Sequence, residues 1–207
     1  MKVLLINGSP RVKGCTYTAL AEAAAALEEE NIQWEIVHIG ANPIQDCVAC
    51  GQCRKLGRCV FDNDSINEIL QKAQVADGFI FGTPVYYAHP SGRVLSALDR
   101  LFYSGGRYFA HKPGFAVASA RRAGTTASLD VLNKYFTIAQ MPVVSSTYWN
   151  MVHGNTPEEV LQDKEGLQTM RNAAKNMAWL LKCIEAGKEK GVVPPQNLKK
   201  DVTNCIR

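Results

Sequence analysis

Residues 1–18 read MKVLLINGSPRVKGCTYT, and this stretch indicates the fold class. The apolar run from Val3 to Ile6 predicts a short buried strand, which Asn7-Gly8 ends. Residues 16–29 are rich in Ala, Leu and Glu and predict a helix after the loop. A buried strand followed by a short loop and a helix is the first half of a βαβ unit. We therefore expect a parallel sheet covered by helices.

The same alternation of strand and helix signals continues along the chain. Further strands are predicted at 34–39, 79–82, 114–119 and 143–148, and further helices at 64–74, 91–103, 125–140 and 164–185. Asp64 or Ser65 is expected to cap the second helix, with Glu68 completing a capping box. Five strands with crossover helices predict one α/β domain over residues 1–186, built on a five-stranded, mostly parallel sheet. Residues 187–207 carry no periodic pattern and are expected to form a C-terminal tail.

The composition is that of a globular chain, with 46% hydrophobic and 20% charged residues. The net charge of +4 is modest, and the chain has no basic stripe interleaved with aromatic residues, so nucleic acid is not an expected partner. No apolar run is long enough for a membrane span, and the run after Met1 is too short for a signal peptide. We therefore expect a cytoplasmic protein without a membrane partner.

The loop between the first strand and the first helix has the features of a phosphate site. A helix start offers unpaired N–H groups and the positive end of the helix dipole. Gly14 lets the backbone come close, and the hydroxyls of Ser9, Thr16 and Thr18 can donate to phosphate oxygens. The loop is not a Walker motif, because no Lys follows Gly14, and the chain lacks the Gly-x-Gly-x-x-Gly fingerprint. The alternative is an ordinary strand-to-helix turn capped by Thr16.

Residues 8–16, GSPRVKGCT, resemble the phosphate loop of NAD(P)H-dependent FMN reductases and multimeric flavodoxin-like proteins, in which Asn usually stands at the position of Cys15. The resemblance covers about residues 1–185 and is closest to the iron–sulfur flavoprotein branch. It continues through CVACGQC at 47–53, GRC at 57–59, DND at 62–64, GTPVYY at 82–87 and LDR at 98–100. It implies a flavodoxin-like three-layer sandwich that binds FMN, with NAD(P)H as electron donor. The implied phosphate-loop residues are Ser9, Arg11, Gly14, Thr16, Thr18 and the backbone N–H of Cys15.

A flavin ring needs a flat slot with apolar contact on one face and polar groups along its pyrimidine edge. The loop after the third strand offers a stiff backbone and two tyrosines, and the resemblance implies that it holds the ring. The loop after the fourth strand can serve the pyrimidine end or the ribityl chain. The candidate residues of the two loops are Pro84, Val85, Tyr86, Tyr87, Ser119, Arg122 and Gly124. Alternatively, the tyrosines cover the sheet edge and the arginines at 121 and 122 face solvent. No catalytic side chain is predicted, because hydride passes from nicotinamide to flavin without one.

Four of the seven cysteines, Cys47, Cys50, Cys53 and Cys59, are closely spaced. Such spacing in a reducing compartment favours metal or redox chemistry over structural disulfides. Four thiolates on a compact loop can surround a cubane, and the resemblance implies a [4Fe–4S] ligand set. A zinc site, free thiols and a redox-labile disulfide are the alternatives. Because the loop follows the second strand, it is expected on the same sheet edge as the flavin.

Together these features predict an FMN-dependent oxidoreductase that transfers electrons from NAD(P)H to a small-molecule or ferredoxin-like acceptor. The alternatives are a non-enzymatic flavin or iron–sulfur electron carrier and a redox sensor. We expect a homodimer or homotetramer, because one flavodoxin-like domain covers only part of the ring. The cysteine loop and the segment Tyr103–Lys112 look too large to pack on their own protomer, and the aromatic residues from Tyr103 to Phe109 suit an interface. The alternative is a mobile surface lid.

Overall fold

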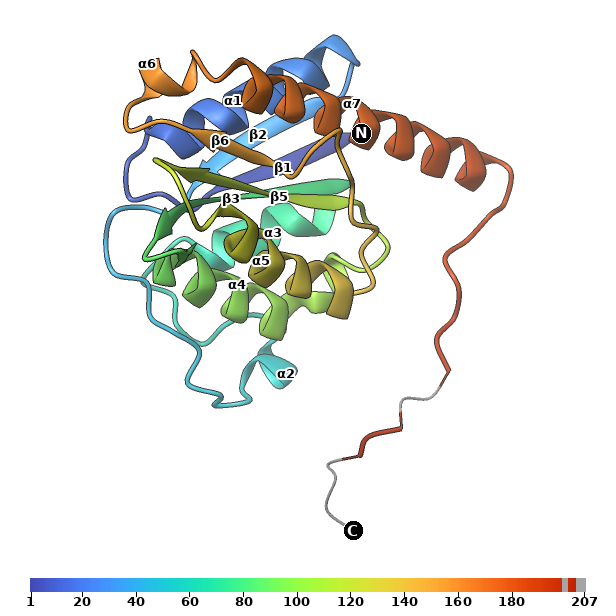
Figure 1. Ribbon diagram of the computed structural model, residues 1–207. Coiled ribbons are helices and arrows are strands. Elements are labelled where there is room, and N and C mark those ends of the chain that lie inside the picture. Colours follow the sequence, from blue (N-terminus) through green and yellow to red (C-terminus); the bar gives the residue numbers. More distant parts are fainter. Residues whose placement is uncertain (199–200, 204–207) are drawn as a thin grey trace.

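The computed structural model describes residues 1–198 and 201–203, which form three layers (Figure 1). In the middle layer five parallel strands lie in the order β2-β1-β3-β5-β6. They are β1 (Lys2–Asn7), β2 (Gln33–His38), β3 (Gly78–Tyr86), β5 (Gly114–Ala120) and β6 (Met151–His153). A short strand, β4 (His89–Pro90), pairs antiparallel with the end of β3. The predicted α/β fold with a parallel sheet is confirmed.

One face of the sheet is covered by α1 (Cys15–Glu29) and α7 (Lys164–Glu189), which lie against each other (Figure 1). Val3 and Leu5 of β1 are fully buried in the core on this side. Helix α7 continues past the predicted domain boundary at residue 186, and part of the predicted tail lies outside the described residues. Within the described ranges, no helix is both long and apolar enough to cross a membrane.

The other face is covered by α3 (Ile66–Val75), α4 (Gly92–Gly105) and α5 (Thr125–Ile138). Leu4 and Ile6 of β1 are buried in the core on this side. Alternate residues of β1 thus enter opposite cores, and both cores are apolar. A strand buried on both faces reads as a continuous apolar run, which is why the sequence identifies it. The three-layer sandwich is confirmed.

The fifth strand differs from the prediction. The sequence predicts a strand at residues 143–148, but only an isolated bridge forms there, and pairing with β5 resumes at β6. Gly114 N donates to Pro142 O at 3.0 Å, and Ala118 N donates to Asn150 O at 3.0 Å. Between these two donors β5 advances four residues while the facing segment advances eight, so four surplus residues loop out of the sheet.

Helix α7 accounts for this departure. Asn176 Nδ2 donates to Ser145 O at 2.9 Å, and Ser146 Oγ donates to Thr169 O at 2.7 Å. The polar groups at 145 and 146 therefore pair with the helix instead of continuing the ladder on β5. A β-branched and aromatic composition predicts strand propensity, but it carries no information about such a tertiary competitor.

Smaller differences are local. Ser65 is the residue before α3 but makes no side-chain cap; Asp64, one residue earlier, accepts from Ile66 N at 3.1 Å through Oδ1. Glu68 does not complete a capping box; its carboxylate pairs with Lys72 Nζ at 2.9 Å. The sequence did not predict the short helical pieces α2 (Cys53–Leu56), α6 (Pro157–Val160) and the 3-10 turn Gly106–Tyr108. Each of them is too short to show a period.

Candidate functional site

Loops that follow four of the parallel strands converge at the carboxyl edge of the sheet, where α/β proteins bind ligands. They line a cavity of about 210 Å³. Its lining residues are Ser9, Arg11, Cys15, Thr16, Pro84, Val85, Tyr86, Ser119, Ala120, Arg121, Gly154 and Asn155. The structure therefore brings together residues of the three loops that the sequence singled out, and adds a fourth loop after β6.

Helix α1 presents its start to this cavity. Gly14 is the residue before the helix, and within the described part of the chain no side chain caps it and no acidic residue lies in its first turn. The first N–H groups and the positive end of the dipole are therefore available to an anion. Thr16 is not the cap, because it lies inside the helix, buried, with its Oγ1 2.8 Å from Ser119 Oγ.

The loop after β1 is held in shape by Asn7 and His38, neither of which is among the predicted site residues. Asn7, fully buried at the end of β1, donates from Nδ2 to Val12 O at 3.0 Å and accepts from Ser9 N at 3.1 Å. His38 Nε2, at the end of β2, lies 2.7 Å from Ser9 O. Ser9 Oγ accepts from Arg11 N at 3.1 Å, so its own O–H is free to donate to a ligand.

Two glycines let the first loop and β3 come together. Gly8 N donates to Gly82 O at 2.9 Å. A Cβ at Gly8 would lie 2.6 Å from that oxygen and 2.7 Å from Val94 Cγ2, and a Cβ at Gly82 would lie 2.8 Å from Thr16 Cγ2. Side chains at either position would therefore push the loop away from the sheet.

The side chains of Cys15 and Thr18 both turn toward backbone oxygens. Cys15 Sγ donates to Gly154 O at 3.6 Å, and Thr18 Oγ1 donates to Gly14 O at 3.3 Å. Burial raises the pKa of the Cys15 thiol, which keeps it neutral and so compatible with a neighbouring anion. The Cys15 side chain is thus engaged with the chain itself, which leaves its N–H group as the candidate contact.

The loop after β3 is a hairpin and not an irregular turn. The strand does not end at Gly82 but continues to Tyr86, and a turn at Tyr87 and Ala88, with φ of 51° and 59°, leads into β4. Tyr86 lines the cavity and is half exposed, whereas the side chain of Tyr87 is fully exposed. Among the residues that the structure describes, Tyr87 therefore covers no sheet edge, and its side chain stands at the rim.

The loop after β5 packs directly on this hairpin. Gly124 has a φ of 97°, and a Cβ there would lie 2.3 Å from Ala88 Cα. Arg121 lines the cavity, and both Arg121 and Arg122 line an adjoining hollow of about 430 Å³. His153 Nε2 lies 3.0 Å from Arg122 O and holds this loop against the end of β6. Arg121 is thus at least as well placed as Arg122, which the sequence favoured.

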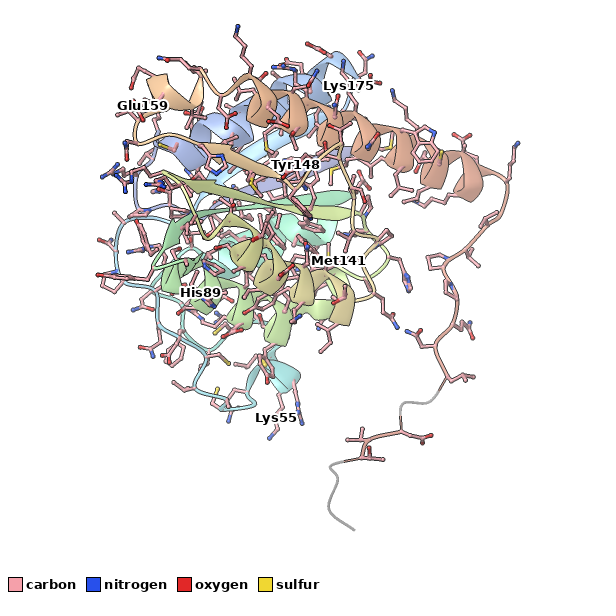
Figure 2. All side chains as sticks on the ribbon, viewed as in Figure 1. Lys55, His89, Met141, Tyr148, Glu159 and Lys175 are labelled. Atoms are coloured by element: carbon pink, nitrogen blue, oxygen red, sulfur yellow. The ribbon has the colours of Figure 1, made fainter. Side chains whose placement is uncertain are left out.

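Gly154 and Asn155 line the cavity but were missed. The predicted fifth strand ended at Tyr148, so the loop that really leaves this strand was not considered. Residues 143–150 line a separate cavity of about 460 Å³ with α5, and Figure 2 shows Tyr148 in that region. The signal that could have found the loop is the short run Met151-Val152-His153 followed by glycine.

The four closely spaced cysteines line a second cavity of about 230 Å³. Cys59 is buried, Cys50 is exposed and the other two are half-buried, and all four are free thiols. Positive φ angles at Ala49, Gly51 and Gly57 let the loop wrap around this space. Within the described ranges, no three His, Cys, Asp or Glu side chains are close enough to share one metal ion. The residue types, their number and their common cavity nevertheless fit an iron–sulfur ligand set.

A buried arginine and an asparagine fix the end of this loop. Arg100 donates from Nε to Cys59 Sγ at 3.1 Å, and its other nitrogens bind Asp64. Asn67 Oδ1 accepts from Cys59 N at 2.9 Å, and Asn67 Nδ2 donates to Cys59 O at 3.1 Å. Although burial lowers the pKa of Arg100, its hydrogen bonds to Asp64 and Cys59 raise it above its usual value. The guanidinium therefore stays charged.

The cysteine cavity does not lie at the expected sheet edge. It is lined by Arg100, Tyr103 and Ser104, near the end of α4, whereas Ser91, just before α4, donates to Gly8 O in the loop after β1. Ser104 comes twelve residues after Gly92 in the helix, a rise of roughly 18 Å along its axis. Figure 2 shows Lys55 of α2 at the bottom of the view, far from Glu159 of α6.

The fold and the edge cavity define a flavodoxin-like protein. A solved flavodoxin from the domain Archaea superposes with a TM-score of 0.60 at 12% identity, over 88% of this chain and 99% of the flavodoxin. The NADPH-dependent FMN reductase family matches residues 1–156, and the chain belongs to this family. An iron-sulfur flavoprotein of Methanocaldococcus jannaschii is 33% identical over 193 residues, which are 89% of this chain and 100% of the relative. One of Methanosarcina thermophila is 28% identical over 195 residues, 92% of this chain and 100% of the relative. The predicted family is confirmed.

Proposed function

We propose that this chain is an FMN-dependent oxidoreductase that takes electrons from NAD(P)H. The observation that carries the proposal is the uncapped start of α1, which faces the same cavity as the β3 hairpin and the β5 loop. Family membership and the names of the relatives support it.

Each loop has a part in holding the cofactor. The N–H groups of Cys15 and Thr16, with the hydroxyl of Ser9, would bind the terminal phosphate, and Arg11 would neutralise it. The hairpin from Pro84 would flank the ring, whose chemistry when bound is to accept hydride from nicotinamide. Arg121 adds positive charge beside the ring loop, which favours binding of an anionic ring.

We propose in addition that Cys47, Cys50, Cys53 and Cys59 hold a [4Fe–4S] cluster. Such a group supplies one-electron transfer, which suits a ferredoxin-like or small-molecule acceptor. Support comes from the four free thiols on one cavity and from the iron-sulfur flavoproteins among the relatives.

Anaerobic purification tests the proposal directly. The protein should be yellow, contain about one FMN per chain, and oxidise NADPH or NADH when an acceptor is present. FAD should bind more weakly, because the first loop closes around a terminal phosphate. A colourless protein that takes up no FMN would contradict the proposal, and a loaded protein inert to both nicotinamides would favour a non-enzymatic carrier.

The role of Arg11 gives a more specific prediction. Arg11→Glu should weaken FMN roughly ten- to hundredfold, because hydrogen bonds to charged groups contribute about 1.5–3 kcal/mol. Lys13→Glu is the matched control, since Lys13 makes the same charge change from the same loop but does not line the cavity. Fluorescence titration with FMN measures both, and equal losses would show a general charge effect instead of a contact.

A homodimer or homotetramer is also proposed, on a smaller surface than the sequence indicated. Phe109 is buried in the core of its own chain, with its ring 4.5 Å from that of Phe102, so it is not available to a partner. Exposed apolar surface remains nearby at Tyr103 and Ile138, which line a hollow of about 530 Å³.

Ile138→Asp should therefore shift the oligomer toward monomer in light scattering, because it places a charge in an apolar contact. Val75→Asp, at a similarly exposed apolar position on α3 outside that hollow, should leave the assembly intact. A wild-type chain that is monomeric and fully active at dilution would rule the oligomer out.

A further inference from the structure

Arg100 is a charged residue that is almost completely buried. It lies on α4 with a side chain only 1% exposed. A buried guanidinium is costly unless each nitrogen finds a partner. Both terminal nitrogens donate to the Asp64 carboxylate, and each also donates to a carbonyl, Gln45 O and Phe61 O, at 3.1 Å. These four hydrogen bonds use the two terminal nitrogens of the guanidinium, so Nε is the one nitrogen left to donate.

The remaining donor is aimed at sulfur. Arg100 Nε donates to Cys59 Sγ at 3.1 Å. Cys59 is the most buried of the four cysteines, and Asn67 holds its backbone at both N–H and C=O. One ligand of the proposed set is therefore fixed in position, with a permanent positive charge donating a hydrogen bond to it.

We propose that Arg100 is a positioning residue that sets the redox potential at the cysteine loop, through its hydrogen bond to Cys59 Sγ and its charge. The proposal rests on the cluster proposed above. A donor to a ligating sulfur, and a nearby cation, stabilise the more negative, reduced form and so raise the potential. Asp64 opposes this effect, because its carboxylate offsets part of the charge that Arg100 brings.

The simpler explanation is that Arg100 only fastens the loop to α4, and the chain offers a control for it. Arg93 lies two turns earlier on the same helix and also anchors the loop after β2. Its guanidinium donates to Gly40 O at 3.1 Å and Ala41 O at 2.9 Å, and also to Asn42 O. In the described structure it bonds no cysteine, so replacing it tests loop anchoring without the sulfur contact.

The experiment is a potentiometric titration of the full chain, reconstituted anaerobically with iron and sulfide and followed by electron paramagnetic resonance. Arg100→Lys keeps the charge but loses the Nε donor. We expect it to favour the oxidised state about tenfold, a fall of about 59 mV for a one-electron couple. Arg93→Lys should leave the potential unchanged. Asp64→Asn should move it in the opposite direction, upward, a reversal that a purely structural role would not produce.

Iron and labile sulfide, assayed per chain, separate the two proposals. A wild-type chain that binds neither overturns the cluster, and with it this inference. A wild-type chain with a cluster whose potential is the same in Arg100→Lys overturns the inference alone. If Arg100→Lys assembles too little cluster to titrate, Asp64→Asn decides: a rise in potential supports the inference, and an unchanged potential overturns it.

Discussion

Replacing any one of Cys47, Cys50, Cys53 and Cys59 by Ala should remove the bound iron and abolish reduction of a one-electron acceptor, while FMN stays bound. All four residues line one cavity, so the loss of any thiolate leaves an incomplete ligand set. FMN should be retained, because the cavity lies near the end of α4, roughly 18 Å along that helix from the phosphate-loop side.

Cys183→Ala is the matched control. Cys183 is an exposed free thiol on α7, which covers the opposite face of the sheet from α4. It should keep iron, FMN and electron transfer. Iron and sulfide assays, flavin absorbance and acceptor kinetics are measured on the same anaerobic samples. If all four variants still reduce every acceptor, the cluster proposal is wrong, and a plain NAD(P)H-dependent FMN reductase is the better proposal.

The fold could be predicted where local sequence and tertiary environment agree. β1 is buried on both faces, so its residues read as an apolar run, and the helices beside it carry periodic patterns. The prediction failed at residues 143–148, where Ser145 and Ser146 hydrogen-bond to α7, to the Asn176 side chain and to the Thr169 carbonyl. Whether this segment pairs with β5 or with α7 depends on contacts between residues far apart in the chain. A single sequence carries no direct information about those contacts.

The candidate site likewise has one part whose position could be predicted from the sequence and one part whose position could not. In a parallel sheet the loops after the strands meet at one edge, so Ser9, Thr16, Val85 and Ser119 could be placed together from strand order alone. The loop after β2 follows no such rule, because it is long and its path depends on where it is anchored. Arg93 and Arg100 fasten it along α4, and this is why the cysteines lie away from the edge where their place in the sequence suggested them.

Gly124→Ala should cost more stability than most single substitutions, and FMN affinity with it. At a φ of 97° a residue with a side chain is strained by about 1–3 kcal/mol. The new Cβ would in addition lie 2.3 Å from Ala88 Cα, so the β3 hairpin must move. Overpacking of this kind costs about 1–3 kcal/mol more. The two costs together, about 2–6 kcal/mol, lower the melting temperature of a chain of this size by about 4–24 °C. Because the hairpin carries Val85 and Tyr86 of the cavity, FMN should bind at least about tenfold more weakly, a loss of about 1.4 kcal/mol.

Gly92→Ala separates this effect from a general response to losing a glycine. Gly92 is the first residue of α4, has an ordinary backbone conformation, and a Cβ there meets nothing within 4 Å. Alanine should be neutral or stabilise by up to about 1 kcal/mol, because it restricts the unfolded chain. Thermal unfolding of the FMN-free proteins and titration with FMN give both quantities. If Gly124→Ala has the melting temperature of the wild type but loses FMN, the hairpin shifts without strain. If both its melting temperature and its FMN affinity equal those of the wild type, the close approach of the β5 loop to the hairpin does not shape the site.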